Sequence, residues 1–140
     1  MSFLLDTNAL SEPQKPRPNE GYMAWIQAQD ASDLHTSVIS IGELQYGVLA
    51  VPRGARRAAI EAWLAEGLVV FGPRVLPIDF KVASVWAAVK LALRRDGKIV
   101  GAIDELIAAT ALVHDLTVIT RNVRHFETSG CKFLSPWAET

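Results

Sequence analysis

Three acidic residues that are far apart in the sequence are the strongest candidates for chemistry. Asp6 follows the short apolar run Phe3–Leu5, Glu43 precedes an apolar run, and Asp104 stands near the start of the apolar segment Ala102–His114. Carboxylate oxygens are the ligands that hard divalent cations such as Mg²⁺ prefer. Three clustered carboxylates would repel one another and raise at least one pKa unless a cation neutralised them. If the fold brings these acids together, they predict a metal site.

Each acid also has a purely structural interpretation. Asp6 could be a turn or helix-cap residue, because Asp hydrogen-bonds readily to nearby backbone amides. Glu43 fits the fourth position of a capping box that starts at Ser40. Asp104 would interact favourably with the dipole at a helix N-terminus. Spacing alone does not decide between the two interpretations.

The elements that would position these acids follow an α/β pattern. The run Phe3–Leu5 ends abruptly in polar residues, which is typical of a strand buried on both faces of a parallel sheet. In such sheets, ligands bind beyond the carboxyl ends of the strands. Further strands are expected at Leu34–Ser37, around Val75–Leu76, at residues 116–120 and at Lys132–Leu134.

Helices are expected between these strands. The segment Phe80–Arg95 is the clearest amphipathic helix, and Ala102–His114 is apolar almost all round, which indicates burial. The region 11–19 contains three prolines and predicts a loop or short turns. Other helices are predicted over residues 22–31, 40–50 and 54–67. The order of elements predicts an α/β sandwich with right-handed crossovers.

The bulk properties restrict the function classes. The length of 140 residues fits a single domain over residues 1–140. The lone Cys131 cannot form an internal disulfide, and no apolar run reaches the roughly 18 to 20 residues that span a bilayer, so we expect a cytoplasmic protein without membrane contact. The net charge of −1 provides no global attraction to nucleic acid, so a polyanion must be held by a local patch or by metal ions.

Four collinear segments carry a resemblance to a known family. They are residues 3–8 (FLLDTN), 37–47 (SVISIGELQYG), 104–111 (DELIAATA) and 120–122 (TRN) with Phe126. Together they resemble the successive motifs of the PIN-domain ribonucleases, and most closely the VapC and FitB type toxins of bacterial toxin–antitoxin pairs. The resemblance covers nearly the whole chain.

The resemblance implies a three-layer α/β/α sandwich with a short central parallel sheet and a metal-dependent endoribonuclease activity, a hydrolase reaction on RNA. It assigns Asp6, Glu43 and Asp104 as catalytic residues that bind Mg²⁺ or Mn²⁺, with Glu43 acting directly or through water. The last motif departs from the family pattern, which commonly has an acid at the position of Asn122, at that of His125, or at both.

The missing fourth carboxylate has a physical consequence. Asn122 would keep an oxygen ligand but remove a negative charge, so we expect one firmly bound ion rather than two. Such an ion can lower the pKa of a bound water and orient it for in-line attack on a phosphodiester. The expected products carry 5′-phosphate and 3′-hydroxyl ends. The residues expected to orient ligands or water are Thr7, Asn8 and Thr120.

Binding partners follow from charge and from the resemblance. The basic candidates for holding the RNA backbone are Arg121, Arg124, His125 and Lys132, with a second patch at Arg53, Arg56 and Arg57. The resemblance implies a cognate VapB/FitA-like antitoxin that lies over the site, inserts an arginine into the acidic pocket and binds operator DNA. A homodimer through apolar helix faces, involving Trp63 or Trp86, is also expected.

Three alternatives remain at the level of sequence. The acidic pocket could have decayed, leaving a PIN domain that only binds antitoxin or RNA. A metal-free ribonuclease could use His35, His114 or His125 as acid and base, which would leave 2′,3′-cyclic phosphate ends and resist EDTA. A phosphoacceptor domain is disfavoured because no lysine follows the strand near residues 118–120.

Overall fold

The computed structural model describes residues 1–139 and contains a five-stranded parallel sheet in the order β3-β2-β1-β4-β5. The central strand pairs in register with both neighbours, Leu5 lying beside Thr36 and Ile119. Parallel pairing places the carboxyl ends of all strands at one edge. The strands are β1 (Phe3–Leu5), β2 (Leu34–Ser37), β3 (Val75–Leu76), β4 (Thr117–Ile119) and β5 (Lys132–Leu134). The predicted parallel sheet is confirmed.

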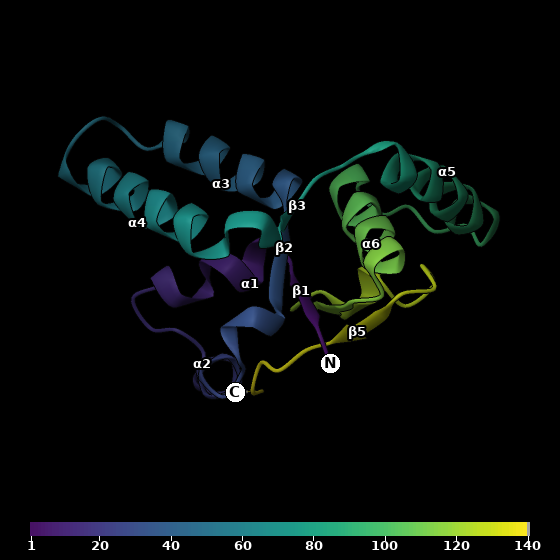
Figure 1. Cartoon of the computed structure of the whole chain (residues 1–140), viewed down its shortest axis with the longest axis horizontal. Coiled ribbons are helices and arrows are strands. Elements are labelled where there is room, and N and C mark those ends of the chain that lie inside the picture. The colour runs from purple at the N-terminus through teal and green to yellow at the C-terminus, as the bar shows by residue number, and fades with distance from the viewer. Residues whose placement is uncertain (140) are drawn as a thin grey trace.

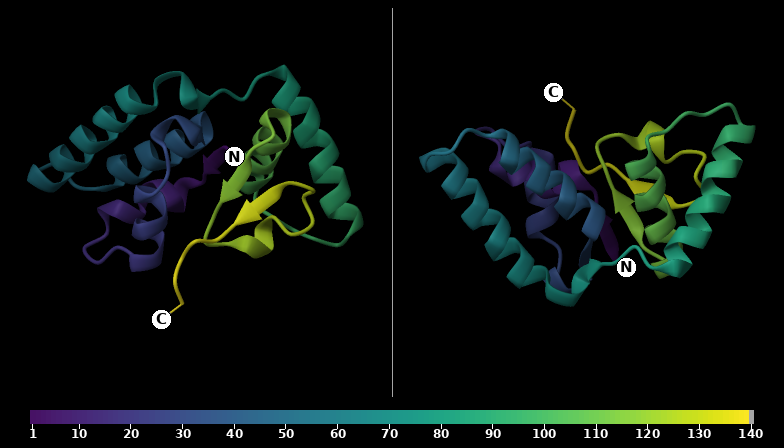
Figure 2. Two further views of the ribbon diagram at one scale, coloured as in Figure 1. Left: turned by 60° about the horizontal axis from the view of Figure 1, so that its bottom comes forward. Right: turned by 90° about the horizontal axis from the view of Figure 1, so that it is seen from above.

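Helices cover both faces of the sheet and complete the predicted three-layer sandwich. The pair α3 and α4 lies on one side, and the pair α5 and α6 lies on the other (Figures 1 and 2). The helices are α1 (Thr7–Ser11), α2 (Glu20–Gln27), α3 (Val38–Ala50), α4 (Ala55–Phe71), α5 (Phe80–Arg95) and α6 (Ala102–His114). Within residues 1–139, the connections also contain short 3₁₀ turns: η1 (Glu12–Gln14), η2 (Ala31–Asp33), η3 (Gly72–Arg74) and η4 (Val123–His125).

Successive side chains of β1 point to opposite faces of the sheet, and each face has its own hydrophobic core. Phe3 and Leu5 point into the core beneath α1 to α4, whereas Leu4 points into the core beneath α5 and α6. This is why the run is apolar throughout.

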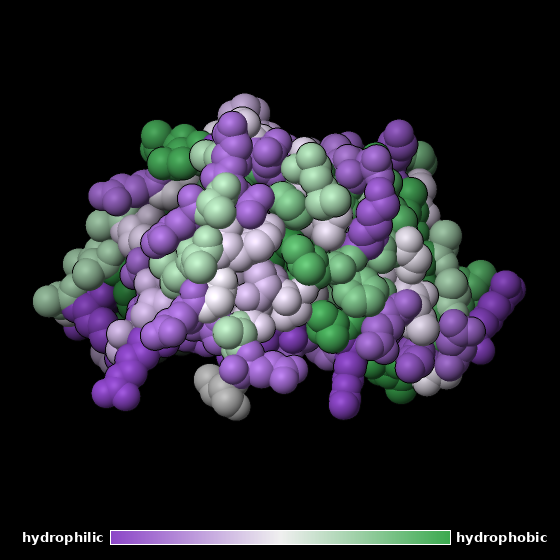
Figure 3. Space-filling view, turned by 90° about the horizontal axis from the view of Figure 1, so that it is seen from below, coloured by the Kyte–Doolittle hydropathy of each residue, from purple (hydrophilic) through white to green (hydrophobic). Residues whose placement is uncertain are grey.

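On the face that includes α2, hydrophobic residues are interspersed with hydrophilic ones (Figure 3). No helix within residues 1–139 is both long and apolar enough to cross a membrane.

The predicted short turns of the proline-rich region 11–19 are present, but the helix α1 that leads into them was not predicted. Helix α1 starts directly after Asp6, and the turn η1 follows with Pro13 in its first turn. Proline is tolerated there because the first N–H groups of a helical turn have no internal partner. The prolines therefore end regular structure only after Gln14.

The predicted bounds of two helices were also inexact. Helix α2 begins at Glu20 rather than at residue 22, because Asn19 caps it by accepting a hydrogen bond from the Tyr22 N–H at 3.0 Å. Helix α4 continues through Gly67 to Phe71 and ends at Gly72, whose φ of 49° lies in the left-handed region. A glycine inside a helix lowers its stability without ending it.

The predicted capping box at Ser40 and Glu43 is wrong. Helix α3 begins at Val38, and the Ser37 hydroxyl caps it by accepting from the Ile39 N–H at 3.1 Å. The chain passes from β2 into α3 without a loop, which moves the cap three residues earlier. Ser40 is buried, and its hydroxyl finds no hydrogen-bond partner within residues 1–139. Glu43 is therefore not engaged in capping.

Candidate functional site

Asp6 is fixed where β1 ends and α1 begins. It is the N-cap residue of α1, and its Oδ1 accepts a hydrogen bond from the Ala9 N–H at 2.8 Å. Its own N–H donates to the Ile119 carbonyl at 3.1 Å, which extends the sheet by one residue. The cap interpretation is thus correct, but it uses one oxygen of a side chain that is only 3 % exposed.

The electrostatics of Asp6 indicate that negative charge gathers around it. Burial raises the pKa of Asp6 to about 6, and the nearby carboxylates of Asp104 and Glu43 add to the rise. Hydrogen bonds from Thr120 and from the Ala9 N–H act in the opposite direction. The fold therefore brings Glu43 and Asp104 within electrostatic reach of Asp6.

Glu43 reaches this region from the second turn of α3. The Thr7 hydroxyl donates a hydrogen bond to Glu43 Oε1, which links α1 to α3 across 36 residues of sequence. Both side chains are partly exposed. Thr7, predicted to orient ligands, therefore positions Glu43 in this structure.

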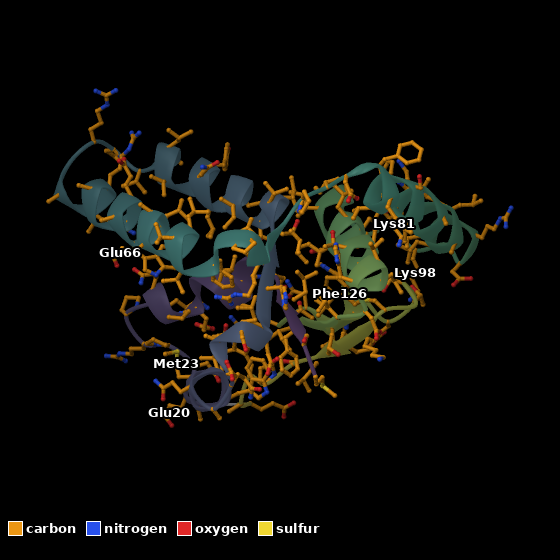
Figure 4. The ribbon with its side chains drawn as sticks, viewed as in Figure 1. Glu20, Met23, Glu66, Lys81, Lys98 and Phe126 are labelled. Carbon is orange, nitrogen blue, oxygen red and sulfur yellow. The ribbon has the colours of Figure 1, made fainter. Side chains whose placement is uncertain are left out.

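Asp104 comes from the first turn of α6 and has a different partner. Its Oδ2 lies 2.5 Å from Nδ1 of His125, which is the last residue of η4. Because a carboxylate only accepts, the Nδ1–H of His125 is the donor. The two side chains are 25 % and 46 % exposed, respectively. Phe126, labelled in Figure 4, is fully buried in the same core as Ile107 of α6 and anchors η4 beside that helix.

The three carboxylates suit a hard divalent cation, although they do not converge on one position in this structure. Each acid is held by its own donor, and no three of the acidic, histidine or cysteine side chains in residues 1–139 are grouped closely enough to hold an ion. The chemistry nevertheless fits, because the donors are carboxylate oxygens, and a cation would stabilise the ionised form of Asp6, whose pKa is raised by burial and further by the nearby carboxylates.

The predicted polar neighbours lie around the acids. The Thr120 hydroxyl is buried beside Asp6 and accepts a hydrogen bond from the Asn122 N–H at 2.9 Å. Asn122 is exposed just before η4, and Asn8 is exposed on α1. Their roles as ligands or as orienting groups stay predictions.

The basic candidates divide into two groups. Arg124 is exposed in η4 beside His125, and Arg121 is exposed close enough to Glu12 for its charge to lower the pKa of that acid. Lys132 instead begins β5, and its Nζ lies 3.5 Å from Asp115. The carboxyl ends of the strands face the other way, so the structure does not bring Lys132 to the acids.

The second predicted patch also divides. Arg56 lines a groove that contains Glu43 and is bounded by α1, α3 and α4. Arg57 is paired with Glu61 at 2.7 Å, and Arg53 lines a separate hollow with them. Of the three arginines, Arg56 is therefore the one that shares a groove with a predicted catalytic acid.

A buried acid and the C-terminal segment were missed by sequence reasoning. Glu12 Oε1 accepts a hydrogen bond from the Trp137 indole at 2.5 Å, and the Lys15 ammonium pairs with the same carboxylate at 3.2 Å. Burial raises the pKa of Glu12, but these donors and the charges of Lys15 and Arg121 outweigh it and hold the pKa below its usual value. Trp137 also stacks on Tyr22 with ring centroids 4.4 Å apart. A contact across 125 residues leaves no local signal in the sequence.

The PIN domain family matches residues 3–130, which is most of the chain. The chain belongs to the PIN-domain family. The resemblance of its motifs is thereby confirmed, and the sheet order and helical layers described above are those of a PIN domain.

Individual relatives of this PIN domain are toxins and ribonucleases. VapC ribonuclease Y4jK of Sinorhizobium fredii is 38% identical over 136 residues, which cover 96% of this chain and 97% of the relative. Toxin FitB of Neisseria gonorrhoeae is 36% identical over 136 residues, which cover 96% of this chain and 98% of the relative. A structure of FitAB bound to an IR36 DNA fragment contains a chain that superposes with a TM-score of 0.93 at 34% identity, covering 99% of this chain and 97% of that one.

Proposed function

We propose that this PIN domain is a metal-dependent endoribonuclease and the toxin of a toxin–antitoxin pair. The observation that carries the proposal is the buried Asp6 carboxylate at the end of β1, with the carboxylates of Glu43 and Asp104 near enough to act on its charge. The relatives named VapC ribonuclease and toxin FitB agree with this function. The protein would act as one domain in the cytoplasm.

The residues of the chain have separable tasks in this proposal. Asp6, Glu43 and Asp104 would hold Mg²⁺ or Mn²⁺, with Asn122 as a further oxygen donor. When bound, the ion supplies a water of lowered pKa and stabilises charge on the leaving oxygen of the phosphodiester. Thr7 holds the carboxylate of Glu43, and Thr120 holds that of Asp6.

The RNA would lie along the basic side chains that share this edge of the molecule. Arg124 is exposed next to His125, the partner of Asp104, and Arg121 is exposed next to Thr120, the partner of Asp6. Arg56 lines the groove that contains Glu43. Because the net charge is −1, these local charges must provide the attraction to phosphate. His125 is engaged with Asp104 and is not free to act in the same way.

The proposed protein partner is a VapB/FitA-like antitoxin that also binds operator DNA. FitAB, which superposes closely, is a complex seen on DNA. On this chain, α3 and α4 expose the large apolar side chains of Tyr46, Leu49, Val69 and Val70. The groove of α1, α3 and α4 leads to Glu43, so an antitoxin segment lying in it could place an arginine against the acids.

A homodimer is also proposed, with a contact centred on side chains other than the half-buried Trp63 and Trp86. Trp63 packs against the first core, and the Trp86 indole donates to Glu105 Oε1 at 3.3 Å beneath the Lys90 ammonium. The large apolar side chains of α5 that are exposed are Phe80 and Leu91. These fit a dimer contact better.

A second candidate function is a binding module without nuclease activity. It is favoured by the fact that Asp104 is already paired with His125, and by the wide placement of the acidic side chains within residues 1–139. Such a protein would bind antitoxin and RNA but would leave RNA intact with any metal.

The deciding experiment is cleavage of bulk tRNA by antitoxin-free protein with Mg²⁺, Mn²⁺ or EDTA, comparing native protein with Asp6→Asn and Asp104→Asn. Loss of several kcal/mol of transition-state stabilisation should slow cleavage by about a thousandfold in each variant. Cleavage in EDTA that leaves 2′,3′-cyclic ends would instead indicate a histidine mechanism. Intact RNA under all conditions would establish the binding module.

A further inference from the structure

His125 occupies a fixed position against Asp104 that the proposed function does not yet explain. Its Nδ1 lies 2.5 Å from Asp104 Oδ2, across 21 residues of sequence. Both side chains are partly exposed, so burial does not force them together. The contact must therefore come from the elements that carry the two residues.

Those elements are anchored in one core. The His125 N–H donates to the Asn122 carbonyl at 3.1 Å, and the next residue, Phe126, is fully buried with Ile107 and Ala108 of α6. The Ser129 hydroxyl donates to the Phe126 carbonyl at 2.7 Å and fixes the chain after η4. Asp104 stands one helical turn before Ala108. The imidazole and the carboxylate are thus held by neighbouring parts of the same packed unit.

We infer that His125 is a positioning residue for the metal site, holding Asp104 through its Nδ1–H so that the other carboxylate oxygen is presented to the cation. This inference rests on the proposed function. A carboxylate that binds metal is itself commonly hydrogen-bonded by a neighbour, and removal of such a neighbour costs about 10- to 100-fold in metal affinity or activity. His125 supplies that neighbour for Asp104, as Thr7 does for Glu43 and Thr120 for Asp6.

The arrangement also suits the charge of the site. A third carboxylate close to Asp6 and Glu43 would otherwise add repulsion at a place where the pKa of Asp6 is already raised. The imidazole N–H donates to one oxygen of Asp104 without adding negative charge. His125 therefore keeps Asp104 available as a ligand before a cation arrives.

The test is a titration of metal-free, antitoxin-free protein with Mn²⁺. Binding is measured by calorimetry and by the electron paramagnetic resonance signal of free Mn²⁺. His125→Ala should weaken Mn²⁺ binding about 10- to 100-fold. His125→Asn should bind within about threefold of native protein, because its Nδ2–H takes the place of Nδ1–H. His125→Gln places its amide where Nε2 stood and should not rescue binding.

Two controls separate this role from a general effect. His114→Ala removes an exposed imidazole from the other end of α6 and should leave Mn²⁺ binding unchanged. Thermal unfolding in EDTA should show that the His125 variants stay folded, because their side chain is half-exposed.

The outcomes distinguish this inference from the proposed function. If native protein binds Mn²⁺ and Asp104→Asn does not, while His125→Ala binds as well as native or more tightly, the positioning role is overturned and the metal site stands. Equal losses in His125→Asn and His125→Ala would also overturn it. If native protein binds no Mn²⁺, both the inference and the metal-dependent function are overturned.

Discussion

The two sides of the acidic site are built in opposite ways. On one side, Asp6 is 3 % exposed at the end of the central strand and is held by a backbone N–H and a buried hydroxyl. On the other side, Asp104 is 25 % exposed at the start of a helix and is held by the imidazole of His125. The buried acid is destabilised in its ionised form, whereas the exposed acid depends on one side-chain partner.

The protonation of Asp6 and the orientation of Asp104 therefore have different structural origins. Desolvation by the sheet and helices makes the Asp6 carboxylate costly, so its protonation reflects the whole fold. The orientation of Asp104 reflects the single residue His125, which can be exchanged without disturbing the core. Changes on the buried side should therefore alter stability as well as metal binding, whereas changes on the exposed side should alter metal binding with little effect on stability.

The largest expected effect contrasts the same substitution on the two sides. Asp6→Asn should stabilise the metal-free protein by about 3 kcal/mol at neutral pH, because a pKa of about 6 rather than 3.8 makes the ionised side chain destabilising by that amount. Asp104→Asn should change stability by at most about 1 kcal/mol, as expected for an exposed pair. Urea denaturation in EDTA measures the change in unfolding free energy of both variants. Equal changes would contradict the proposed difference between the buried and the exposed acid.

The sign of the pH dependence follows from the same pKa. Between pH 3.8 and about 6, the folded state binds more protons at Asp6 than the unfolded state does. The contribution of Asp6 to stability therefore falls as pH rises through this window and stays low above it. The difference in unfolding free energy between native protein and Asp6→Asn should grow over that range in EDTA. A constant difference would contradict the raised pKa.

A smaller effect extends the buried side to the C-terminal segment. Trp137→Phe keeps a ring to stack on Tyr22 but leaves the buried Glu12 Oε1 without its indole donor, which should cost about 2 kcal/mol. Trp25→Phe is the matched control, since Trp25 contacts Phe3 edge-on within the same core. Urea denaturation should show the larger loss for Trp137→Phe. The reverse order would show that stacking, rather than the hydrogen bond, holds the segment.

The smallest effect concerns RNA binding beside Glu43. In an Asp6→Asn background that leaves RNA uncut, Arg56→Ala should reduce the slope of log Kd against log salt by about one. Arg53→Ala removes the same charge from a different hollow and should leave the slope unchanged. Fluorescence anisotropy with a labelled RNA measures both. Equal slopes for the two variants would place the RNA elsewhere.

Much of the fold could be predicted because the strands are short, largely apolar and bounded by polar or turn-forming residues. The run Phe3–Leu5 gave both the central strand and the position of Asp6, and helix α6 was bounded correctly from its apolar composition. Glu43 was misjudged in its local setting because Ser37 and Ser40 offer equally good caps, and only the direct passage from β2 into α3 decides between them.

The partners of the acids could not be predicted, because they come from distant parts of the chain. Thr7 meets Glu43, and His125 meets Asp104, only after α1, α3, α6 and η4 have packed. His125 was predicted to bind RNA, since an exposed basic side chain gives no local sign of a carboxylate 21 residues earlier. The paired Trp137 and Glu12 were missed for the same reason.

The most direct test of the contrast is a carbon-13 NMR titration of the Asp6 side-chain carboxyl, with and without Mg²⁺. Metal-free protein should titrate near pH 6, and saturating Mg²⁺ should move the titration to lower pH, because a cation stabilises the ionised carboxylate. An Asp6 that titrates near 3.8 without metal, or that does not respond to Mg²⁺, would contradict a buried acid awaiting a cation.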